Sequence, residues 1–250
     1  MIIYRRVSVM IVAILLCLLP LCCLVDEEDD TLSDSEEAIA RSVATMYSFT
    51  FKALQSRDMY GQENGASKTY LQTACPTIHW WDACNWIIDF GDGCTASDGN
   101  YYSGSITAVS CQELHYSQFC QNEYCIDGEI SFSSDVDCDA DQCYQQIVDA
   151  TFSGPEDTVT IYQNAVAGVT GTTYYLFAPS NLSVTSQVHG SYSSAVQVTL
   201  RRDRTECPFP TVGIVYITVT GHDPITIDFN TGDCYTAFVN GIETDLTEKQ

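Results

Sequence analysis

The sequence predicts a mainly β protein, an antiparallel sandwich or meander with one N-terminal helix, stapled by disulfides. Tyr, Thr, Ser, Val and Ile are plentiful and only 17% of the residues are charged, a composition that suits pleated sheets. Short runs of alternating apolar and polar residues, separated by turn residues, fill the C-terminal part of the chain. Ten of the 13 cysteines lie beyond residue 25, and an even number in an exported chain favours disulfides over zinc or free thiols.

Residues 1–25 have the pattern of an export signal or membrane anchor. Two arginines precede a nearly unbroken apolar stretch, and an acidic run follows it. Cys22 and Cys23, at the end of this stretch, are candidate lipidation sites. The residue before Cys22 is not small, and the apolar run counted to Val25 reaches 19 residues, close to the length of a membrane span. We therefore expect an exported protein of the cell-envelope surface, attached to the membrane through a lipid or through the signal itself, or alternatively secreted.

The next segments are an acidic tether over 26–35 and a helix over 36–57. Ser33 or Ser35 can cap this helix, and acidic residues in its first turn suit the positive end of the helix dipole. Apolar residues recur at helical spacing and predict a stripe that packs on the β-domain: Ile39, Val43, Met46, Tyr47 and Leu54. A polar loop is expected over 58–69.

The rest of the chain, 70–250, is expected to form a β-rich domain. Its C-terminal part has eight short alternating runs separated by turn residues, and Asn240-Gly241 between two of them predicts a two-residue hairpin. Similar runs lie in 87–131, broken by a cysteine-dense insertion at 111–143. A second, weaker helix is expected over 142–151.

Two parts of this domain resemble each other. Each has Cys-Pro, a strand, an Ile-Asp-Phe strand, a Gly/Asp turn and a second cysteine. A strand entered from Cys-Pro and a partner leaving through the turn bring their far ends together, so we predict the disulfides Cys75–Cys94 and Cys207–Cys234. Each would close a loop of about 20 to 28 residues and stabilise the fold by about 3 to 3.5 kcal/mol. The other six cysteines admit 15 connectivities, among which the sequence does not choose: Cys84, Cys111, Cys120, Cys125, Cys138 and Cys143.

The second repeat unit carries a family resemblance. Cys-Pro-Phe-Pro-Thr-Val-Gly at 207–213, then Ile-Thr-Ile-Asp-Phe-Asn-Thr-Gly-Asp-Cys at 225–234 and a late Asn-Gly hairpin, resemble the ending of bacterial exported lipoproteins with Asp-Phe-Gly…Cys β-units. The resemblance covers 70–110 and 205–246. It implies a β-rich cell-surface protein and supplies no activity. Asn230 stands in place of the expected glycine, and asparagine tolerates the same turn conformations.

The charge of the chain favours cations as partners over nucleic acid. The formal net charge is −23 at pH 7, and such a surface repels phosphate backbones. Carboxylates at alternate positions could converge on Ca²⁺, the one cofactor that the sequence suggests, at Asp135, Asp137, Asp139 and Asp141. Ala140 and Gln146 stand where a calcium loop has its turn glycine and its bidentate acid, so a solvated acidic loop is the alternative.

The sequence offers few other candidate binding or catalytic residues. Trp80, Trp81 and Trp86 are a candidate binding surface for a sugar or a protein if they are exposed, and core residues if they are buried. Asp89 and Asp228 are equivalent in the repeat, and paired carboxylates can act on a glycoside, but such aspartates more often accept hydrogen bonds in turns. The chain has no motif of a Ser/His/Asp triad, a zinc protease, a phosphate loop or a dinucleotide site.

These observations predict a non-catalytic cell-surface lipoprotein with a structural, adhesive or ligand-binding role and a protein or glycan partner. The alternative is a secreted hydrolase acting on polysaccharide. Exposed tryptophans without facing acids would favour binding, whereas two carboxyl groups about 5 to 10 Å apart in a cleft would favour hydrolysis.

Overall fold

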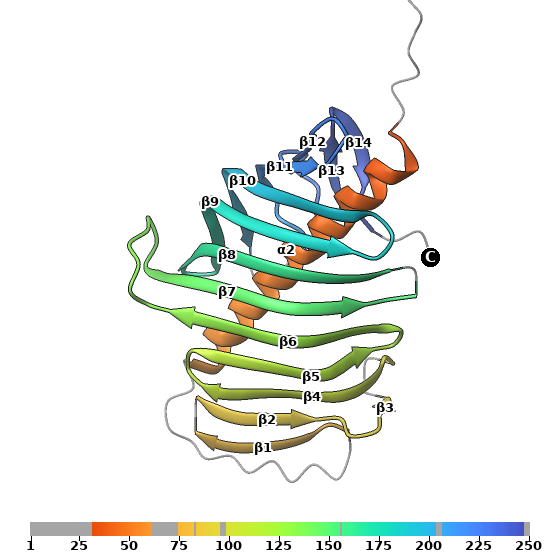
Figure 1. The fold of residues 1–250 in the computed structure, drawn as a ribbon. Coiled ribbons are helices and arrows are strands. Elements are labelled where there is room, and N and C mark those ends of the chain that lie inside the picture. The colour runs from red at the N-terminus through yellow and green to blue at the C-terminus, as the bar shows by residue number, and fades with distance from the viewer. Residues whose placement is uncertain are drawn as a thin grey trace, which may run out of the picture. The chain divides into compact units, whose positions relative to one another are not determined.

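In the computed structural model of this chain, an antiparallel sheet curls around a long helix (Figure 1). The structure describes residues 32–61, 75–82, 84–95, 99–155, 157–203 and 207–247. These residues form helix α2 (Asp34–Gly61) and strands β1 (Thr77–Asp82), β2 (Asn85–Asp89), β3 (Cys94–Thr95), β4 (Tyr101–Ser110), β5 (Glu113–Gln121), β6 (Tyr124–Ser133), β7 (Gln142–Ser153), β8 (Thr158–Thr170), β9 (Thr173–Ser186), β10 (Gly190–Asp203), β11 (Val212–Val219), β12 (Ile225–Asp228), β13 (Thr236–Val239) and β14 (Ile242–Asp245).

The helix starts at a capping box. The Ser33 hydroxyl accepts the N–H of Glu36 at 3.3 Å, and the Glu36 carboxylate accepts the N–H of Ser33 at 3.0 Å. The Ser33 hydroxyl also donates to this carboxylate, and these bonds from Ser33 lower the pKa of Glu36. The predicted cap Ser33 is confirmed, and the helix begins at Asp34, two residues before the predicted start and inside the segment expected to be a tether. It continues to Gly61, so the loop expected over 58–69 is wrong for 58–61, and the remainder of that loop lies outside the described residues.

Of the two predicted arrangements, a sandwich and a meander, the sheet forms the meander. Strands β1, β2 and β4 to β14 follow one another in sequence order, each antiparallel to the next, and β3 pairs with β4. Within the described residues β1 pairs only with β2 and β14 only with β13, so the sheet is open at both ends. Such a sheet needs a partner on its apolar face, because a single layer exposes that face to water.

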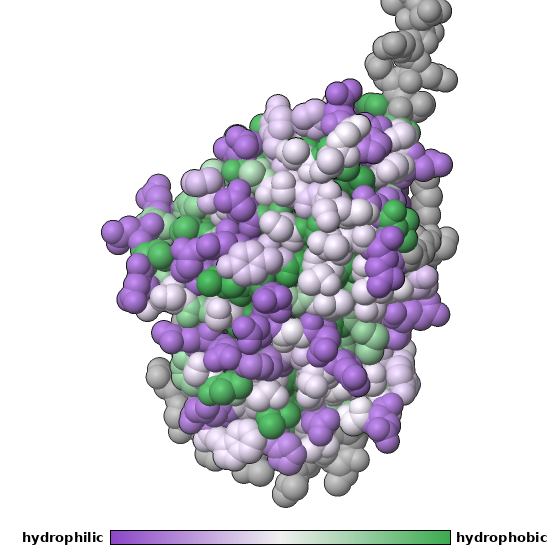
Figure 2. Space-filling view, viewed as in Figure 1, coloured by the Kyte–Doolittle hydropathy of each residue, from purple (hydrophilic) through white to green (hydrophobic). Residues whose placement is uncertain are grey.

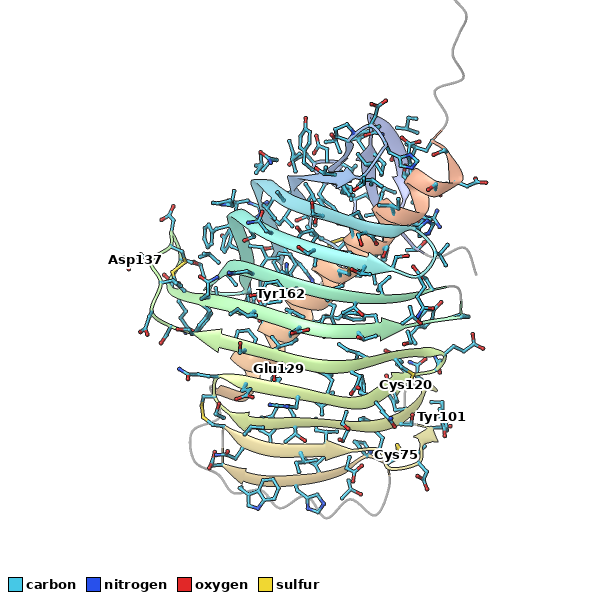
Figure 3. All side chains as sticks on the ribbon, viewed as in Figure 1. Cys75, Tyr101, Cys120, Glu129, Asp137 and Tyr162 are labelled. Carbon is cyan, nitrogen blue, oxygen red and sulfur yellow. A yellow bond between two sulfur atoms is a disulfide. The ribbon has the colours of Figure 1, made fainter. Side chains whose placement is uncertain are left out.

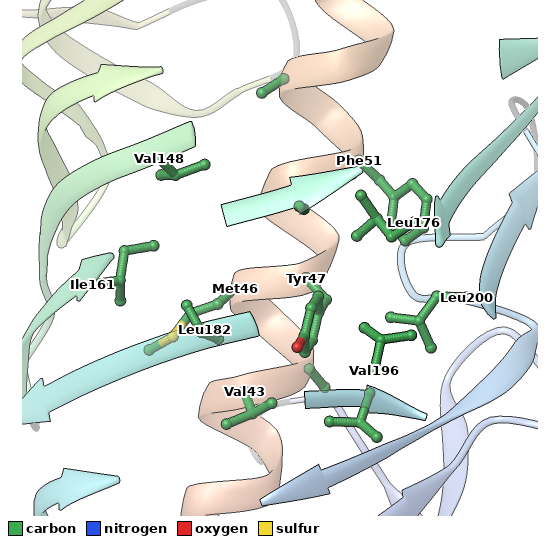
Figure 4. Packing of buried hydrophobic residues seen from close by; sticks show 14 of the residues in the cluster. Val43, Met46, Tyr47, Phe51, Val148, Ile161, Leu176, Leu182, Val196 and Leu200 are labelled. Atoms are coloured by element: carbon green, nitrogen blue, oxygen red, sulfur yellow. The ribbon is translucent and has the colours of Figure 1, made fainter. Parts of the chain in front are cut away.

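Helix α2 is the partner that covers the inner face of the sheet. Side chains alternate inward and outward along each strand, and the inward residues of β6 to β13 are almost fully buried. Val148 and Ile161 approach the helix from one side, and Leu176 and Leu200 approach it from the other (Figure 4). Several helix residues on these faces have no measurable exposure: Val43, Ala44, Tyr47, Phe51 and Leu54.

Hydrogen bonds fix the position of the helix within this apolar contact. The buried Tyr47 hydroxyl lies 3.0 Å from the Ser194 hydroxyl on β10. The Thr50 hydroxyl donates to the Gln163 amide oxygen on β8 at 2.5 Å. The buried Arg202 guanidinium on β10 donates to the Ser48 carbonyl of the helix at 3.4 Å and to the Cys207 carbonyl at 2.7 Å, and burial lowers its pKa. Because an unpaired polar group would be costly here, these bonds select one docked arrangement.

Two sequence predictions within the sheet are wrong. Residues 142–151 are not a helix but most of β7, with Tyr144, Gln146, Val148 and Ala150 pointing inward at every second position. Pairing with β6 and β8 on both sides outweighs the local helix propensity of this segment. The stretch 111–143 is not an insertion: it contains β5, β6 and the start of β7, and its cysteines lie at the strand connections.

The disulfides confirm the repeat. Cys75 pairs with Cys94 and Cys207 pairs with Cys234, as the two units predict. In each unit the phenylalanine after the Ile-Asp strand donates its N–H to a glycine carbonyl of a neighbouring strand. The other six cysteines form the pairs Cys84–Cys111, Cys120–Cys125 and Cys138–Cys143 (Figure 3). The predicted hairpin is present as well, because Asn240 and Gly241 join β13 to β14 with φ of 49° and 86°.

We expect Phe51→Ala to lower the free energy of unfolding by about 3 to 5 kcal/mol, because it leaves a cavity between the helix and the inner face of the sheet. Chemical denaturation followed by circular dichroism measures this loss. Thr45→Ala, at an exposed position of the same helix, is the control and should change stability by less than about 0.5 kcal/mol. Equal losses in the two variants would contradict the proposed packing.

We also expect the five disulfides to stabilise the fold by different amounts, according to the length of the loop that each closes. Cys207 and Cys234 are 27 residues apart, whereas Cys120 and Cys125 are 5 apart. The chain-entropy model assigns about 3.5 kcal/mol to the first bond and about 2 kcal/mol to the second. Replacing each pair by alanines and measuring urea denaturation tests this order, and a larger loss for the Cys120–Cys125 pair would overturn it.

Candidate functional site

The face of the sheet turned away from α2, called here the outer face, carries aligned rows of polar side chains. Strand register places His115 opposite Glu129, Glu129 opposite Asp149, Asp149 opposite Tyr162 and Tyr162 opposite Ser183. These five residues follow one line across β5 to β9, on the side opposite the buried positions, and Figure 3 labels two of them, Glu129 and Tyr162. Neighbouring strands are about 4.8 Å apart, so adjacent members of the row can contact the same ligand.

A second row on the outer face is made of hydroxyl groups. Thr151 lies opposite Thr160, Thr160 opposite Thr185 and Thr185 opposite Ser191. The hydroxyls of Thr151 and Thr160 are 3.2 Å apart. Figure 2 shows that this side of the molecule is mostly hydrophilic, with scattered apolar side chains. The outer face is therefore a broad polar surface with many hydrogen-bonding groups.

Tyr162 is the large aromatic side chain within the first row. Its side chain is 49% exposed, and its neighbours across the sheet are Asp149 and Ser183. Thr160 and Asn164 flank it on β8, two residues away on the same face. An aromatic ring is thus surrounded by carboxylate, hydroxyl and amide groups on a rigid strand.

The outer face has no cationic side chain over most of its area. The sequence contains no lysine or arginine between Lys68 and Arg201, so β1 to β9 and nearly all of β10 carry only acidic and neutral residues and two histidines, His79 and His115. Negative potential from this surface attracts cations and repels phosphate groups. An anionic polymer is therefore a poor ligand for it.

Three potential metal ligands converge on the outer face. Glu113 and His115 are two residues apart on β5, and Glu129 faces His115 from β6. One ligand atom from each of the three lies within 4.8 Å of the others. His115 Nε2 is 2.5 Å from a Glu113 carboxylate oxygen, and the two side chains are 41% and 39% exposed. Sequence analysis missed this group, because only the strand register brings Glu129 beside the Glu-x-His pair.

The three tryptophans do not form one exposed row. Trp86 is 3% exposed and belongs to the core, so its place in the predicted binding surface is wrong. Trp81 is 62% exposed and stacks on the ring of His79 at 6.3 Å. The two positions differ because β2 turns Trp86 toward the core, whereas Trp81 lies at the end of the edge strand β1. The side chain of Trp80 lies outside the described residues.

The four predicted calcium ligands lie in the connection between β6 and β7. Asp135, Asp137, Asp139 and Asp141 are exposed, and no three of their carboxylates lie within 4.8 Å of one another. The Cys138–Cys143 disulfide closes this connection, which folds against Gly168 of β8 and borders an open hollow of about 440 Å³. Calcium binding here stays a prediction.

The repeated aspartates have structural partners. Asp89 accepts the N–H of Gly91 at 2.8 Å, and Asp228 accepts the N–H of Asn230 at 2.9 Å. These are the turn hydrogen bonds that the repeat indicates, and they occupy the same position in both units. Asp89 and Asp228 are therefore turn residues that support the two disulfide-closed ends of the sheet.

The candidate lipidation residues Cys22 and Cys23 lie outside the described residues. Among the residues that the structure describes, no helix combines the length and the apolar character needed to cross a membrane. Comparison with family models, with curated proteins and with solved structures finds no match to this chain. The geometry of the outer face is therefore the basis for assigning a function.

Proposed function

We propose that this protein is a non-catalytic lipoprotein of the cell-envelope surface that binds a neutral glycan on its outer face. The observation that carries the proposal is Tyr162, an exposed ring between Asp149 and Ser183 on the polar outer face. Sugar rings present an apolar face of C–H groups and an edge of hydroxyls. An aromatic ring meets the first, and carboxylate, amide and hydroxyl groups meet the second.

The charge of the outer face supports a neutral glycan over other polymers. With no lysine or arginine between Lys68 and Arg201, the surface offers no partner for phosphate, sulfate or uronate groups. Its acidic residues can still accept hydrogen bonds from sugar hydroxyls. This excludes nucleic acid and anionic polysaccharide from the proposed ligands.

The open geometry supports binding over hydrolysis. A glycosidase places two carboxyl groups on either side of the scissile bond and excludes bulk water from the reaction. Glu113 and Glu129 instead stand side by side on a sheet face, with Glu113 and its neighbour His115 both well exposed to solvent. An open surface with an aromatic ring suits the binding of an extended chain without its hydrolysis.

Two features of the chain support export and lipid attachment. All ten cysteines beyond residue 25 are paired, which suits an oxidising compartment. The acidic residues that precede Ser33 would separate a lipid on Cys22 or Cys23 from the capped helix. The outer face would then be presented to glycans at the cell surface.

Mass spectrometry of the mature N-terminus tests the anchorage. We expect a lipid-modified cysteine at position 22 or 23 in the membrane fraction. The Cys22→Ser/Cys23→Ser double variant should lack this modification. An unmodified N-terminus in the medium, or a signal segment retained in the membrane, would overturn lipid attachment while leaving glycan binding to be judged separately.

Affinity electrophoresis in gels containing neutral polysaccharides tests the ligand. We expect Tyr162→Ala to weaken binding about tenfold or more, because it removes the stacking surface at the centre of the row. Tyr235→Ala is the matched control, since Tyr235 is also 49% exposed but lies beyond Cys234 in the connection between β12 and β13. Retarded migration that is equal in wild type and Tyr162→Ala, or absent with every polysaccharide, would contradict the proposal.

A further inference from the structure

We propose that Glu113, His115 and Glu129 form a binding site for a divalent transition-metal ion of the zinc type. The site goes beyond glycan binding and does not depend on it. Three side chains of the right chemistry already converge within 4.8 Å on the outer face.

The backbone holds these ligands in place. Glu113 and His115 point to the same side of β5 because they are two residues apart, and Glu129 is the direct cross-strand partner of His115. Both strands are interior strands, since β5 also pairs with β4 and β6 also pairs with β7. The Cys120–Cys125 disulfide joins β5 to β6 near the end of the same hairpin. Only side-chain rotations are therefore needed to complete the site.

The distances require a small adjustment. His115 Nε2 and the Glu113 carboxylate oxygen are 2.5 Å apart and share a hydrogen bond. Zinc bonds of about 2.0 to 2.2 Å place two donors of a tetrahedral centre roughly 3.3 Å apart. An ion that enters between the two atoms would replace the shared proton. It would increase the distance between them by about 1 Å, and rotation of the Glu113 side chain can provide this increase.

The donor set indicates the class of metal. One imidazole nitrogen with two carboxylates suits zinc and its neighbours in the first transition row. Ca²⁺ is a weaker fit, because it takes six to eight oxygen ligands. Three protein ligands leave a further position for water. Asp149, which faces Glu129 from β7, stands next along the same row.

The electrostatic surroundings favour a cation independently of the ligand geometry. Glu113 and Glu129 bring two negative charges together, and Asp149 adds a third one strand away. The sequence supplies no lysine or arginine to this sheet before Arg201 to balance them. A bound divalent ion would neutralise the two ligating carboxylates and relieve their repulsion.

Isothermal titration of Zn²⁺ into the full chain, after treatment with a chelator, tests this inference. We expect one zinc ion per chain, and an affinity that falls about tenfold or more in both His115→Ala and Glu129→Gln. Two control variants should keep wild-type affinity: His222→Ala removes another exposed histidine, and Asp137→Asn alters the acidic connection between β6 and β7. Tyr162→Ala should also keep it, which separates this site from glycan binding.

Thermal unfolding with and without Zn²⁺ distinguishes loss of the metal site from loss of the fold. We expect the variants to melt like wild type without metal, and only wild type and the controls to gain stability when zinc is added. Absence of zinc binding, equal binding in His115→Ala, or loss of binding in Asp137→Asn would each overturn the assignment.

Discussion

The burial of helix α2 against the inner face of the sheet is the contact on which the rest of the structure depends. A meander that is open at both ends has one layer only, so its apolar face needs a cover. Tyr47, Phe51 and Leu54 supply that cover and have no measurable exposure. Because the helix packs on the inner face, the outer face is the one that carries the polar residues.

The two repeat units stabilise opposite ends of this open sheet. One unit includes the edge strand β1, and the other lies among β11 to β14 near the opposite edge. In both, an aspartate binds the following turn and a disulfide closes the unit. Asp89 and Asp228 thus have a structural role, and the outer face between the two ends carries the candidate site.

The proposed metal site shows why the candidate site was only partly predictable. Glu113 and His115 are visible in the sequence as a Glu-x-His pair, and alternation along a strand puts both on one face. Their partner Glu129 depends on the register between β5 and β6, which contains an irregularity between Tyr116 and Phe119. A shift of one residue there would send Glu129 to the inner face, and no local signal fixes it. The sequence left Trp86 open between a binding surface and the core for a related reason, because the face that it takes depends on the docking of β2.

The sequence by itself determined the properties that depend on neighbouring residues. These are the β-rich class, the capped helix, the Asn240-Gly241 hairpin and the disulfides of the repeat, which follow from side-chain period, turn chemistry and short loop closure. Only the tertiary structure decided that residues 142–151 are a strand, that α2 covers one face, and that Tyr162 and the Glu113–His115–Glu129 group lie on the other. Those outcomes are set by strand register and by packing between segments far apart in the chain, and both are collective properties of the folded sheet.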